Sequence, residues 1–454
     1  MSGEENAPLI ESRADLIEVM AAGGKPKSEW RIGTEHEKHV YRKAPIRPVP
    51  YEGDDGIHAL LDGIEARTGW HPFFDRGNPI GLRNLGAVGG ISLEPGGQFE
   101  LSGAPQLTIH DAALELDSHL EDCRTIGGPL NIHFLGLGVT PVWRVADIPA
   151  MPKSRYGIMT PYMNKVGTLG TSMMYRSCTV QSNLDFSDEA DMVKKLRVSV
   201  ALQPIVTALF ANSPFVDGKP SSYLSFRSHI WLNTDRARTG MLPFAFEDGF
   251  GFERYADYAL DVPMYFVIRK GEYINVAGES FRDFLTGKLP QLPGTKPTLK
   301  DWENHLSTLF PEVRLKQFLE QRGADMGDRG HVLALSALWA GLLYDSESLD
   351  AAWDIVSDWT NEERETLRND VPRAAIHTPF RNGTVGDIAR LVVDLADDGL
   401  RRRKNLRTGE DETIYLAPLK ETLDLGKTQA ERWIDRYNGA WGCDLSHIYD
   451  EAEI

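Results

Sequence analysis

Two stretches of this sequence decide the fold that we expect, Ile32-Gly-Thr-Glu-His-Glu37 and Ser92-Leu-Glu-Pro-Gly-Gly-Gln-Phe-Glu-Leu-Ser102. Glu35 and Glu37 lie two residues apart, and side chains at this spacing share one face of a β-strand. In the second stretch Glu100 has polar residues two positions away on either side and apolar residues next to it. Each stretch therefore predicts a strand with one acidic face and one buried face.

The acidic face of these strands needs a partner, because carboxylates that crowd together repel each other. A lone pair of glutamates at this spacing is typical of a solvated strand. Here, however, Gly33, Gly96 and Gly97 flank the acids and permit a close approach by a ligand, and no lysine occurs on the expected inner face. We therefore interpret the strands as a site for Mg²⁺ and a nucleotide, because Mg²⁺ takes oxygen ligands and bridges carboxylates to phosphates.

Two further segments, Cys178–Phe186 and Tyr223–Trp231, alternate in the same way and are predicted to be strands of an antiparallel sheet. Gln181 and Asn183 lie on the polar face of the first segment. Arg227 lies on the polar face of the second, and a guanidinium suits a carboxylate or phosphate because it bonds such groups bidentately. An exposed strand arginine paired with a neighbouring acid is the alternative for Arg227.

Helical patterns occupy most of the remaining sequence. A long helix is predicted over 188–211, capped by Ser187, and Pro204 is expected to kink or split it. Beyond about residue 297 further helices are predicted at Leu299–Leu309, Val332–Leu343, Leu349–Trp359, Glu362–Asn369, Val385–Gly399 and Thr428–Tyr437. Strands followed by helices predict an α+β fold and argue against a parallel, doubly wound sheet.

Composition and charge limit the classes of protein that fit. The 454 residues carry a formal net charge of −17, which argues against a general nucleic-acid or anionic-membrane binder. No apolar run approaches the ~20 residues that span a bilayer. The three cysteines have no metal-binding or disulfide spacing, and the polar N-terminus lacks a signal or transit pattern. We therefore expect a soluble protein of the cytoplasm.

Three common signatures are present only in part. Gly426-Lys-Thr428 resembles the end of a P-loop, but Glu421 stands where the leading glycine belongs. Leu135–Pro141 holds two glycines of a dinucleotide fingerprint, then a proline where a helix should begin. His36 and His39 are three residues apart, whereas a zinc-protease helix needs four. These three classes are therefore set aside.

Two basic loops, Met151–Tyr162 and Lys165–Arg176, are further candidates for binding phosphates. Arg155, Lys165 and Arg176 carry positive charge that would neutralise phosphate oxygens there. The glycines of these loops are also consistent with ordinary turns.

Taken together, these motifs resemble the glutamate–cysteine ligases of the plant type, a branch that proteobacteria also carry. The matching segments run from about Trp30 to the end of the chain: Ile32–Lys38, Ser92–Ala104, Met151–Met159, Val180–Ser187, Ser225–Trp231, Ala259–Phe266, Asp301–Arg314, Ile355–Trp359 and Tyr437–Trp441. The resemblance rests on many long matches in the same order, and not on one short pattern.

The resemblance implies a cup-shaped, mainly antiparallel β-sheet with surrounding helices, related to glutamine synthetase. It also implies a reaction in which ATP phosphorylates the γ-carboxylate of L-glutamate and the amine of L-cysteine then attacks the acyl phosphate. The product is γ-glutamylcysteine, made in the first step of glutathione biosynthesis. ATP and Mg²⁺ are the implied cofactors, and the implied metal ligands are Glu35, Glu37, Glu94 and Glu100.

Other residues also receive expected roles. The resemblance implies that Arg227 is catalytic and contacts the transferring phosphate or the acyl phosphate. The binding candidates for nucleotide, phosphates and substrate carboxylates are Arg155, Lys165, Arg176, Gln181 and Asn183. We expect residues 1–28 to form a helical extension and 29–454 to form one catalytic domain, with a sheet core at about 29–297 and a helical portion at about 298–454.

The sequence leaves alternatives open. A glutamate ligase with another amine acceptor would share the same acidic strands, and a catalytically silent protein would bind nucleotide or glutathione without turnover. The cysteines that form regulatory disulfides in plant enzymes are replaced here at the matching positions, Ala113, Val276 and Gln291, so a plant-like redox switch is not expected. We expect small-molecule substrates, no nucleic-acid or membrane partner, and either a monomer or a homodimer.

Overall fold

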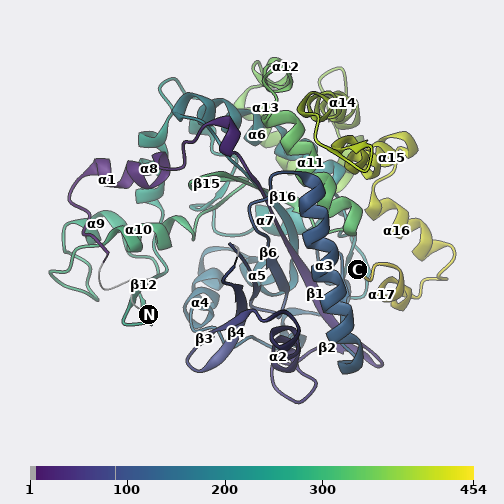
Figure 1. The fold of residues 1–454 in the computed structure, drawn as a ribbon, viewed down its shortest axis with the longest axis horizontal. Helices are drawn as coiled ribbons and strands as arrows, with labels where there is room; N and C mark the ends of the chain where they lie inside the picture. The colour runs from purple at the N-terminus through teal and green to yellow at the C-terminus, as the bar shows by residue number, and fades with distance from the viewer. Residues whose placement is uncertain (1–6, 87) are drawn as a thin grey trace.

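A computed structural model of the protein describes residues 7–86 and 88–454. Within these residues ten strands form one antiparallel sheet in the order β15-β16-β8-β1-β6-β5-β4-β3, and β2 and β7 also pair with β1. The strands are β1 Ile32–Lys43, β2 Ile46–Pro48, β3 His71–Asp75, β4 Asn78–Asn84, β5 Gly89–Leu93, β6 Phe99–Ser102, β7 His133–Leu135, β8 Thr179–Leu184, β15 Val313–Leu315 and β16 Leu319–Asp325. Figure 1 shows β1 running through the middle of the molecule.

Strand β1 is central because neighbours pair with both of its edges. β8 lies on one side and β6 on the other, both antiparallel to it. The register places Glu35 opposite Ser102 and Gln181, and Glu37 opposite Glu100. The two acidic stretches of the sequence are therefore neighbouring strands, and their carboxylates share one face as predicted.

The second acidic stretch forms two strands, where the sequence predicted one. β5 ends at Leu93 and β6 begins at Phe99, and a turn joins them into a hairpin. Gly97 has a φ of +81° in that turn, a conformation that side chains rarely adopt. Pro95 and the glycines after it interrupt the strand, so Glu94 lies at the turn.

Helices surround the sheet. They are α1 Arg13–Ala21, α2 Ile57–Thr68, α3 Ile109–Gly127, α4 Tyr156–Val166, α5 Gly170–Arg176, α6 Glu189–Leu209, α7 Phe226–Leu232, α8 Phe252–Asp261, α9 Phe281–Leu285, α10 Leu299–Leu306, α11 Arg329–Leu343, α12 Ser346–Val356, α13 Asn361–Ala374, α14 Val385–Arg403, α15 Ala417–Leu425, α16 Gln429–Asn438 and α17 Ile448–Glu451. Short strands also pair outside the sheet: β9 Phe215–Val216 with β10 Lys219–Pro220, β11 Thr239–Gly240 with β14 Phe310–Pro311, β12 Phe266–Arg269 with β13 Glu272–Asn275, β17 Pro379–Phe380 with β18 Gly383–Thr384, and β19 Leu406–Arg407 with β20 Glu410–Asp411.

The main core lies between the sheet and helices α6 and α11. α11 packs on β1 and β8, and α6 packs on β16. Every residue of α11 from His331 to Leu343 is buried, as expected for a helix that is enclosed on all sides. A second core joins α1 to α8 and α10 through Leu16 and Met20, at the left of Figure 1.

The segment Tyr223–Trp231 was predicted to be a strand, and this prediction is wrong. The structure places α7 there, because Ser225 caps a helix: its Oγ accepts a hydrogen bond from the backbone N–H of Ser228. Arg227 is therefore a helix residue. A short run of alternating polar and apolar residues fits both a strand and one face of a short helix, and the capping serine decides between them.

Helix α6 also differs from the prediction. It is capped by Asp188 rather than by Ser187, and it continues past Pro204 without a break. All residues from Val198 to Leu209 are buried, so tertiary packing outweighs the hydrogen bond that the proline removes.

The expected division between sheet and helices along the chain is not observed. Helices α2, α3, α4, α5 and α8 lie within the stretch expected to form the sheet core, and β15 and β16 lie within the stretch expected to be helical. An antiparallel sheet pairs strands from distant parts of a chain, so the two kinds of element need not separate in sequence. No helix in the described residues is long and apolar enough to cross a membrane.

Helices α11 and α14 cross closely where Gly341 meets Gly399. A Cβ atom on Gly399 would lie 2.0 Å from the carbonyl oxygen of Gly341. We expect Gly399→Ala to push the helices apart and to lower the thermal unfolding midpoint, since overpacking costs about 1–3 kcal/mol.

Gly157→Ala is the matched control for this substitution. Gly157 lies in the first turn of α4, and no described atom would lie within 4 Å of its added Cβ. Alanine favours a helix over glycine, so this variant should keep or raise the midpoint. Equal midpoints for Gly399→Ala and the parent protein would contradict the close crossing.

Candidate active site

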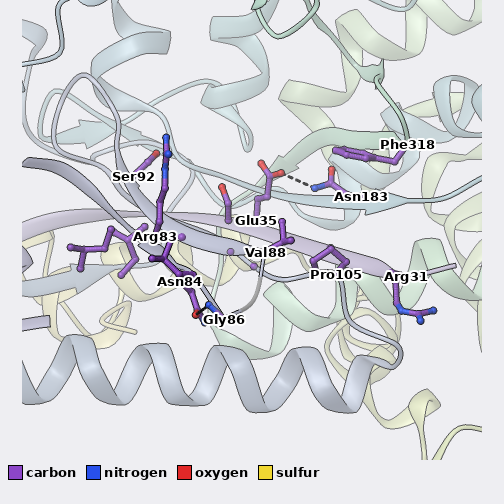
Figure 2. Close-up of a pocket in the computed structure, with 18 of the residues that line it drawn as sticks. Arg31, Glu35, Arg83, Asn84, Gly86, Val88, Ser92, Pro105, Asn183 and Phe318 are labelled. Atoms are coloured by element: carbon purple, nitrogen blue, oxygen red, sulfur yellow. Dashed lines mark hydrogen bonds between the residues drawn. The ribbon is translucent and has the colours of Figure 1, made fainter. Parts of the chain in front are cut away.

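Two adjoining cavities meet at Glu35. The smaller, of about 270 Å³, lies over the paired acids of β1 and β6, and the larger, of about 760 Å³, lies along β4 and β5. At their junction Asn183 donates a hydrogen bond of 2.7 Å from Nδ2 to Glu35 Oε1. Figure 2 shows the larger cavity, with Glu35 between Asn183 on one side and Arg83 on the other.

Four carboxylates form one wall of the smaller cavity. Glu35 and Glu37 come from β1, Glu100 comes from β6, and Glu94 lies at the turn between β5 and β6. The sequence predicted these four residues as metal ligands, and the structure brings all of them to one cavity.

Burial and mutual repulsion make this wall a poor place for negative charge. Burial, together with the neighbouring Glu100 and Glu94, holds the pKa of Glu37 well above its usual range, although Thr179 donates its backbone N–H to the carboxylate at 3.0 Å. Burial and the charges of Glu94 and Glu35 raise the pKa of Glu100 to about 7. A cation at this wall would offset the repulsion.

Four guanidinium groups line the same cavity, and together they are called the guanidinium wall. They belong to Arg155, Arg227, Arg314 and Arg322. Arg155, just before α4, donates to Glu94 Oε1 at 3.5 Å. Arg227 is 2% exposed, and its Nη2 donates to the carbonyl oxygen of Arg322 at 3.0 Å. Among the described residues its Nε has no hydrogen-bond partner, so this guanidinium keeps donor capacity for an anion.

Arg314 and Arg322 are held side by side by Glu320, which is fully buried on β16. Both Nε and Nη2 of Arg314 donate to this carboxylate at 2.8 Å, and Arg322 Nη1 donates to it at 2.5 Å. One carboxylate thus supports two guanidiniums and Lys316, and the excess positive charge faces the cavity.

The sequence prediction missed Arg314 and Arg322 as site residues. Arg314 stands in a segment that resembles the family, but its role depends on β15 and β16 joining the sheet, and this part of the chain was expected to be helical. Glu320 and Arg322 lie two residues apart in the sequence, and this spacing could have indicated a strand with charged groups on one face.

Of the binding residues predicted from the sequence, three line the cavities and two do not. Gln181 Oε1 accepts a hydrogen bond of 2.8 Å from Arg322, and Asn183 binds Glu35. Arg176 is buried outside both cavities, where it donates to Asp217 at 2.9 Å, and Lys165 is exposed on α4. The structure therefore does not bring Arg176 and Lys165 to the cavities that hold the other predicted residues.

The larger cavity combines apolar walls with basic residues. Its apolar lining residues are Phe73, Leu82, Leu85, Val88, Ile91, Pro105 and Phe318. Lys25, Arg31 and Arg83 also line it, and the Arg83 guanidinium lies 4.8 Å from the centre of the Phe73 ring. Apolar surface suits a nucleotide base, and positive charge suits its phosphates.

The carboxylates fit Mg²⁺ as hard oxygen donors. In the described parts of the chain, no three His, Cys, Asp or Glu side chains are close enough together to hold a metal ion by themselves. Mg²⁺ does not need such a cage, because it usually keeps water and takes one or two carboxylates together with substrate phosphates. The buried and mutually repelling Glu37 and Glu100 therefore suit an ion that arrives with phosphate.

The fold and the site define the class of this protein. An antiparallel sheet carries carboxylates that share a cavity with guanidinium groups, beside a second cavity suited to a nucleotide. The chain is thus an α+β enzyme equipped for carboxylate and phosphate chemistry.

Comparison with known proteins gives the particular family. The model of glutamate–cysteine ligase family 2 matches residues 31–451, and the chain belongs to this family. Similar proteins include the chloroplastic glutamate–cysteine ligases of Medicago truncatula (53% identical over 97% of this chain and 85% of that protein), Nicotiana tabacum (54%, 97% and 82%) and Arabidopsis thaliana (53%, 97% and 82%).

Solved structures share the fold at low sequence identity. The glutamate–cysteine ligase of Francisella tularensis, in complex with AMP, has a TM-score of 0.55 at 11% identity and covers 93% of this chain and 87% of that one. A bifunctional glutathione synthetase from Pasteurella multocida has a TM-score of 0.54 at 13% identity and covers 97% of this chain and 53% of that one.

The comparisons confirm three predictions and overturn one. The family, the α+β class with a large antiparallel sheet and the glutamate–cysteine ligase activity are confirmed. The predicted cytoplasmic location is wrong, because these close relatives are all chloroplastic enzymes. A small number of cysteines does not distinguish one reducing compartment from another.

The raised pKa of Glu37 leads to a prediction about stability. A carboxyl group whose folded pKa lies above its unfolded value of 4.5 stabilises the fold at low pH, and that stability is lost as the pH rises through the folded pKa. We therefore expect Glu37→Gln to raise the thermal midpoint of the metal-free protein at about pH 8 and to change it little at about pH 5.

Glu52→Gln, at an exposed position, is the control and should have no such pH dependence. A midpoint for Glu37→Gln that is lower than that of the parent protein at about pH 8 would show that the Glu37 charge is not destabilising.

Proposed function

We propose that the two cavities together join the γ-carboxylate of L-glutamate to the amine of L-cysteine at the expense of ATP. The activity follows from membership of the glutamate–cysteine ligase family. One structural observation supports the mechanism: four carboxylates and four guanidinium groups line the smaller cavity together, next to a larger cavity with apolar and basic lining.

The larger cavity is the proposed place of the nucleotide base and sugar. Its volume of about 760 Å³ suits a ligand of that size, and Glu35 at the junction would lie near the phosphates. The Francisella tularensis relative was solved with AMP, which supports a nucleotide on this fold. Glutamate would then occupy the smaller cavity, with Arg155 positioned for one of its carboxylates.

The proposed reaction has two steps. A γ-carboxylate oxygen of glutamate attacks the γ-phosphorus of ATP, and the bond from this phosphorus to the bridging oxygen breaks as ADP leaves. The amine of cysteine then attacks the acyl carbon, the carbon–oxygen bond to phosphate breaks, and the amine loses a proton as inorganic phosphate leaves.

Charge in the first step is distributed between the two walls. Arg227, whose Nε has no hydrogen-bond partner among the described residues, and its neighbour Arg322 would bind the transferring phosphate and orient it for in-line attack. Glu35, Glu37, Glu94 and Glu100 are the proposed ligands of Mg²⁺, which would take one or two of them together with the substrate phosphates. When bound, this ion supplies positive charge that offsets the charge developing on the phosphate oxygens.

Apolar side chains line the rest of the smaller cavity. Met159, Met174, Trp231, Phe266 and Phe310 are among them. An acyl phosphate is hydrolysed by water, so walls that exclude water protect it until the amine attacks.

The direct test is release of ADP by the purified protein with Mg-ATP and glutamate, with cysteine, 2-aminobutyrate or alanine as acceptor. The proposal predicts strong stimulation by cysteine and a γ-glutamylcysteine product identified by mass spectrometry. Turnover with another amine in preference to cysteine would contradict the acceptor, and a complete lack of turnover would contradict the ligase function.

Glu35 provides a test of the metal site. Glu35→Gln keeps the shape of the side chain and a hydrogen-bonding oxygen for Asn183, but removes one charge next to the proposed phosphates. We expect turnover to be lost, or the Mg²⁺ concentration for half-maximal rate to rise sharply, while the thermal midpoint stays close to that of the parent. Full activity at ordinary Mg²⁺ would remove Glu35 from the metal site.

Arg227 provides a test of phosphate recognition. Lysine keeps the positive charge but loses the planar pair of donors, so Arg227→Lys should lower kcat by about tenfold or more. Arg236→Lys, at an exposed position in the loop after α7, is the control and should leave kcat unchanged. A kcat for Arg227→Lys equal to that of the parent would exclude bidentate recognition.

A further inference from the structure

A buried carboxylate at the end of β16 lies behind the guanidinium wall. Asp325 is 1% exposed, and in the described chain it does not line either cavity. Its Oδ2 accepts hydrogen bonds from Ser213 Oγ at 2.6 Å and from the backbone N–H of Asn212 at 2.9 Å. Its Oδ1 accepts from Ser225 Oγ at 2.8 Å. A buried charge is costly unless several donors compensate it, so this arrangement is a specific one.

Both serines connect Asp325 to the first turn of α7. Ser225 Oγ donates to Asp325 and accepts from the backbone N–H of Ser228 at 3.1 Å. Ser213 Oγ donates to Asp325 and accepts from the backbone N–H of Arg227 at 3.1 Å. The carboxylate therefore acts on the N-terminus of α7 through two hydroxyl groups, and negative charge at that end stabilises a helix.

Helix α7 needs such support because it is short. It has seven residues, and an isolated helix of this length is not stable in water. The helix carries Arg227, whose side chain is also held at its far end, where Nη2 donates to the carbonyl oxygen of Arg322 on β16. Strand β16 thus fixes both ends of Arg227. Asp325 holds the backbone amide of Arg227 indirectly, and Arg322 holds its guanidinium.

The backbone of β16 is irregular between these two contacts. Its pairing with β8 shifts register between Gln321 and Ala324. Gly323 lies in this irregular part, and a Cβ there would come within 2.2 Å of Gln203 Oε1. β-Bulges near active sites commonly change the direction of neighbouring groups, and here Arg322 lies inside the irregular segment.

We propose that Asp325 is a positioning residue of the ligase: it holds α7 through Ser213 and Ser225 so that the Arg227 guanidinium faces the carboxylate wall. The inference rests on the proposed role of Arg227 at the transferring phosphate. The inference adds residues that hold Arg227 in place and touch neither the substrate nor the reacting atoms.

A double-mutant cycle tests the proposal. Asp325→Asn keeps the size of the side chain but replaces one acceptor oxygen by an amide that cannot accept from a serine hydroxyl. We expect kcat to fall by about tenfold, with the KM for each substrate changed by less than about twofold, because an interaction used in the transition state is lost. In the Arg227→Lys background the same substitution should lower kcat by less than about twofold, because the two residues act as one unit.

Asp397→Asn is the matched control. Asp397 is also a buried carboxylate, 5% exposed, but it lies on α14, where it pairs with Arg401 and Lys420. This variant should lower the thermal midpoint. It should leave the kcat of the folded protein unchanged in both the parent and the Arg227→Lys backgrounds.

If Asp325→Asn does not fold, Ser225→Ala replaces it in the same experiment. This variant removes one of the two hydroxyl connections and keeps the carboxylate. Hydrogen exchange at the backbone amides of Arg227 and Ser228 gives an independent readout. Exchange at these two amides should accelerate in Asp325→Asn or Ser225→Ala, and should not accelerate in Asp397→Asn.

The outcomes separate this inference from the proposed function. Suppose that Arg227→Lys lowers kcat, and that the Asp325 or Ser225 substitution lowers kcat by the same factor in the Arg227→Lys background as in the parent protein. The positioning role is then overturned and the role of Arg227 stands. If Arg227→Lys leaves kcat unchanged, the role of Arg227 and the inference that rests on it are both overturned. A small additional effect together with faster exchange in α7 supports the positioning role.

Discussion

Glu37 on β1 and Glu100 on β6 lie directly opposite each other, and the site depends on this pairing. Like charges directly opposite each other destabilise an antiparallel pair, and burial increases this cost. Arg227 compensates only part of it, since its charge lowers the pKa of Glu37 less than burial and the neighbouring acids raise it. The sheet therefore holds carboxylates whose mutual repulsion is offset only in part, a cost to stability that is common at functional sites.

Several other parts of the fold supply the guanidinium groups and hold them in the cavity. Arg155 precedes α4, Arg227 lies on α7 and Arg322 lies on β16, so the wall is assembled from segments far apart in the sequence. Glu320 and Asp325, at the two ends of β16, fix the positions of these cations from behind. Helix α6 packs on β16 and links this strand to the main core. A rigid layer of this kind is what precise placement of charge requires.

The acidic strands could be predicted from the sequence because a two-residue spacing is a local property of β-structure. Arg227 was also predicted to be a site residue, and it lines the smaller cavity although the segment predicted to be a strand forms a helix. The positions of Arg176 and Lys165 could not be predicted, since α4 and α5 decide where their side chains point. Arg322 was missed for a related reason: its place in the site depends on pairing between β16 and β8, which are separated by more than a hundred residues.

In the reaction proposed for this site, the γ-phosphoryl group of ATP is transferred to the γ-carboxylate of glutamate before cysteine reacts. Positional isotope exchange tests it most directly, with ATP labelled by ¹⁸O at the oxygen that bridges the β- and γ-phosphorus atoms. With Mg²⁺ and glutamate, and without cysteine, reversible formation of the acyl phosphate should move label from the bridging into the non-bridging β-phosphate positions of recovered ATP. The exchange should disappear when glutamate is left out. Absence of exchange in a preparation that makes γ-glutamylcysteine at its normal rate would contradict reversible formation of an acyl phosphate before cysteine reacts.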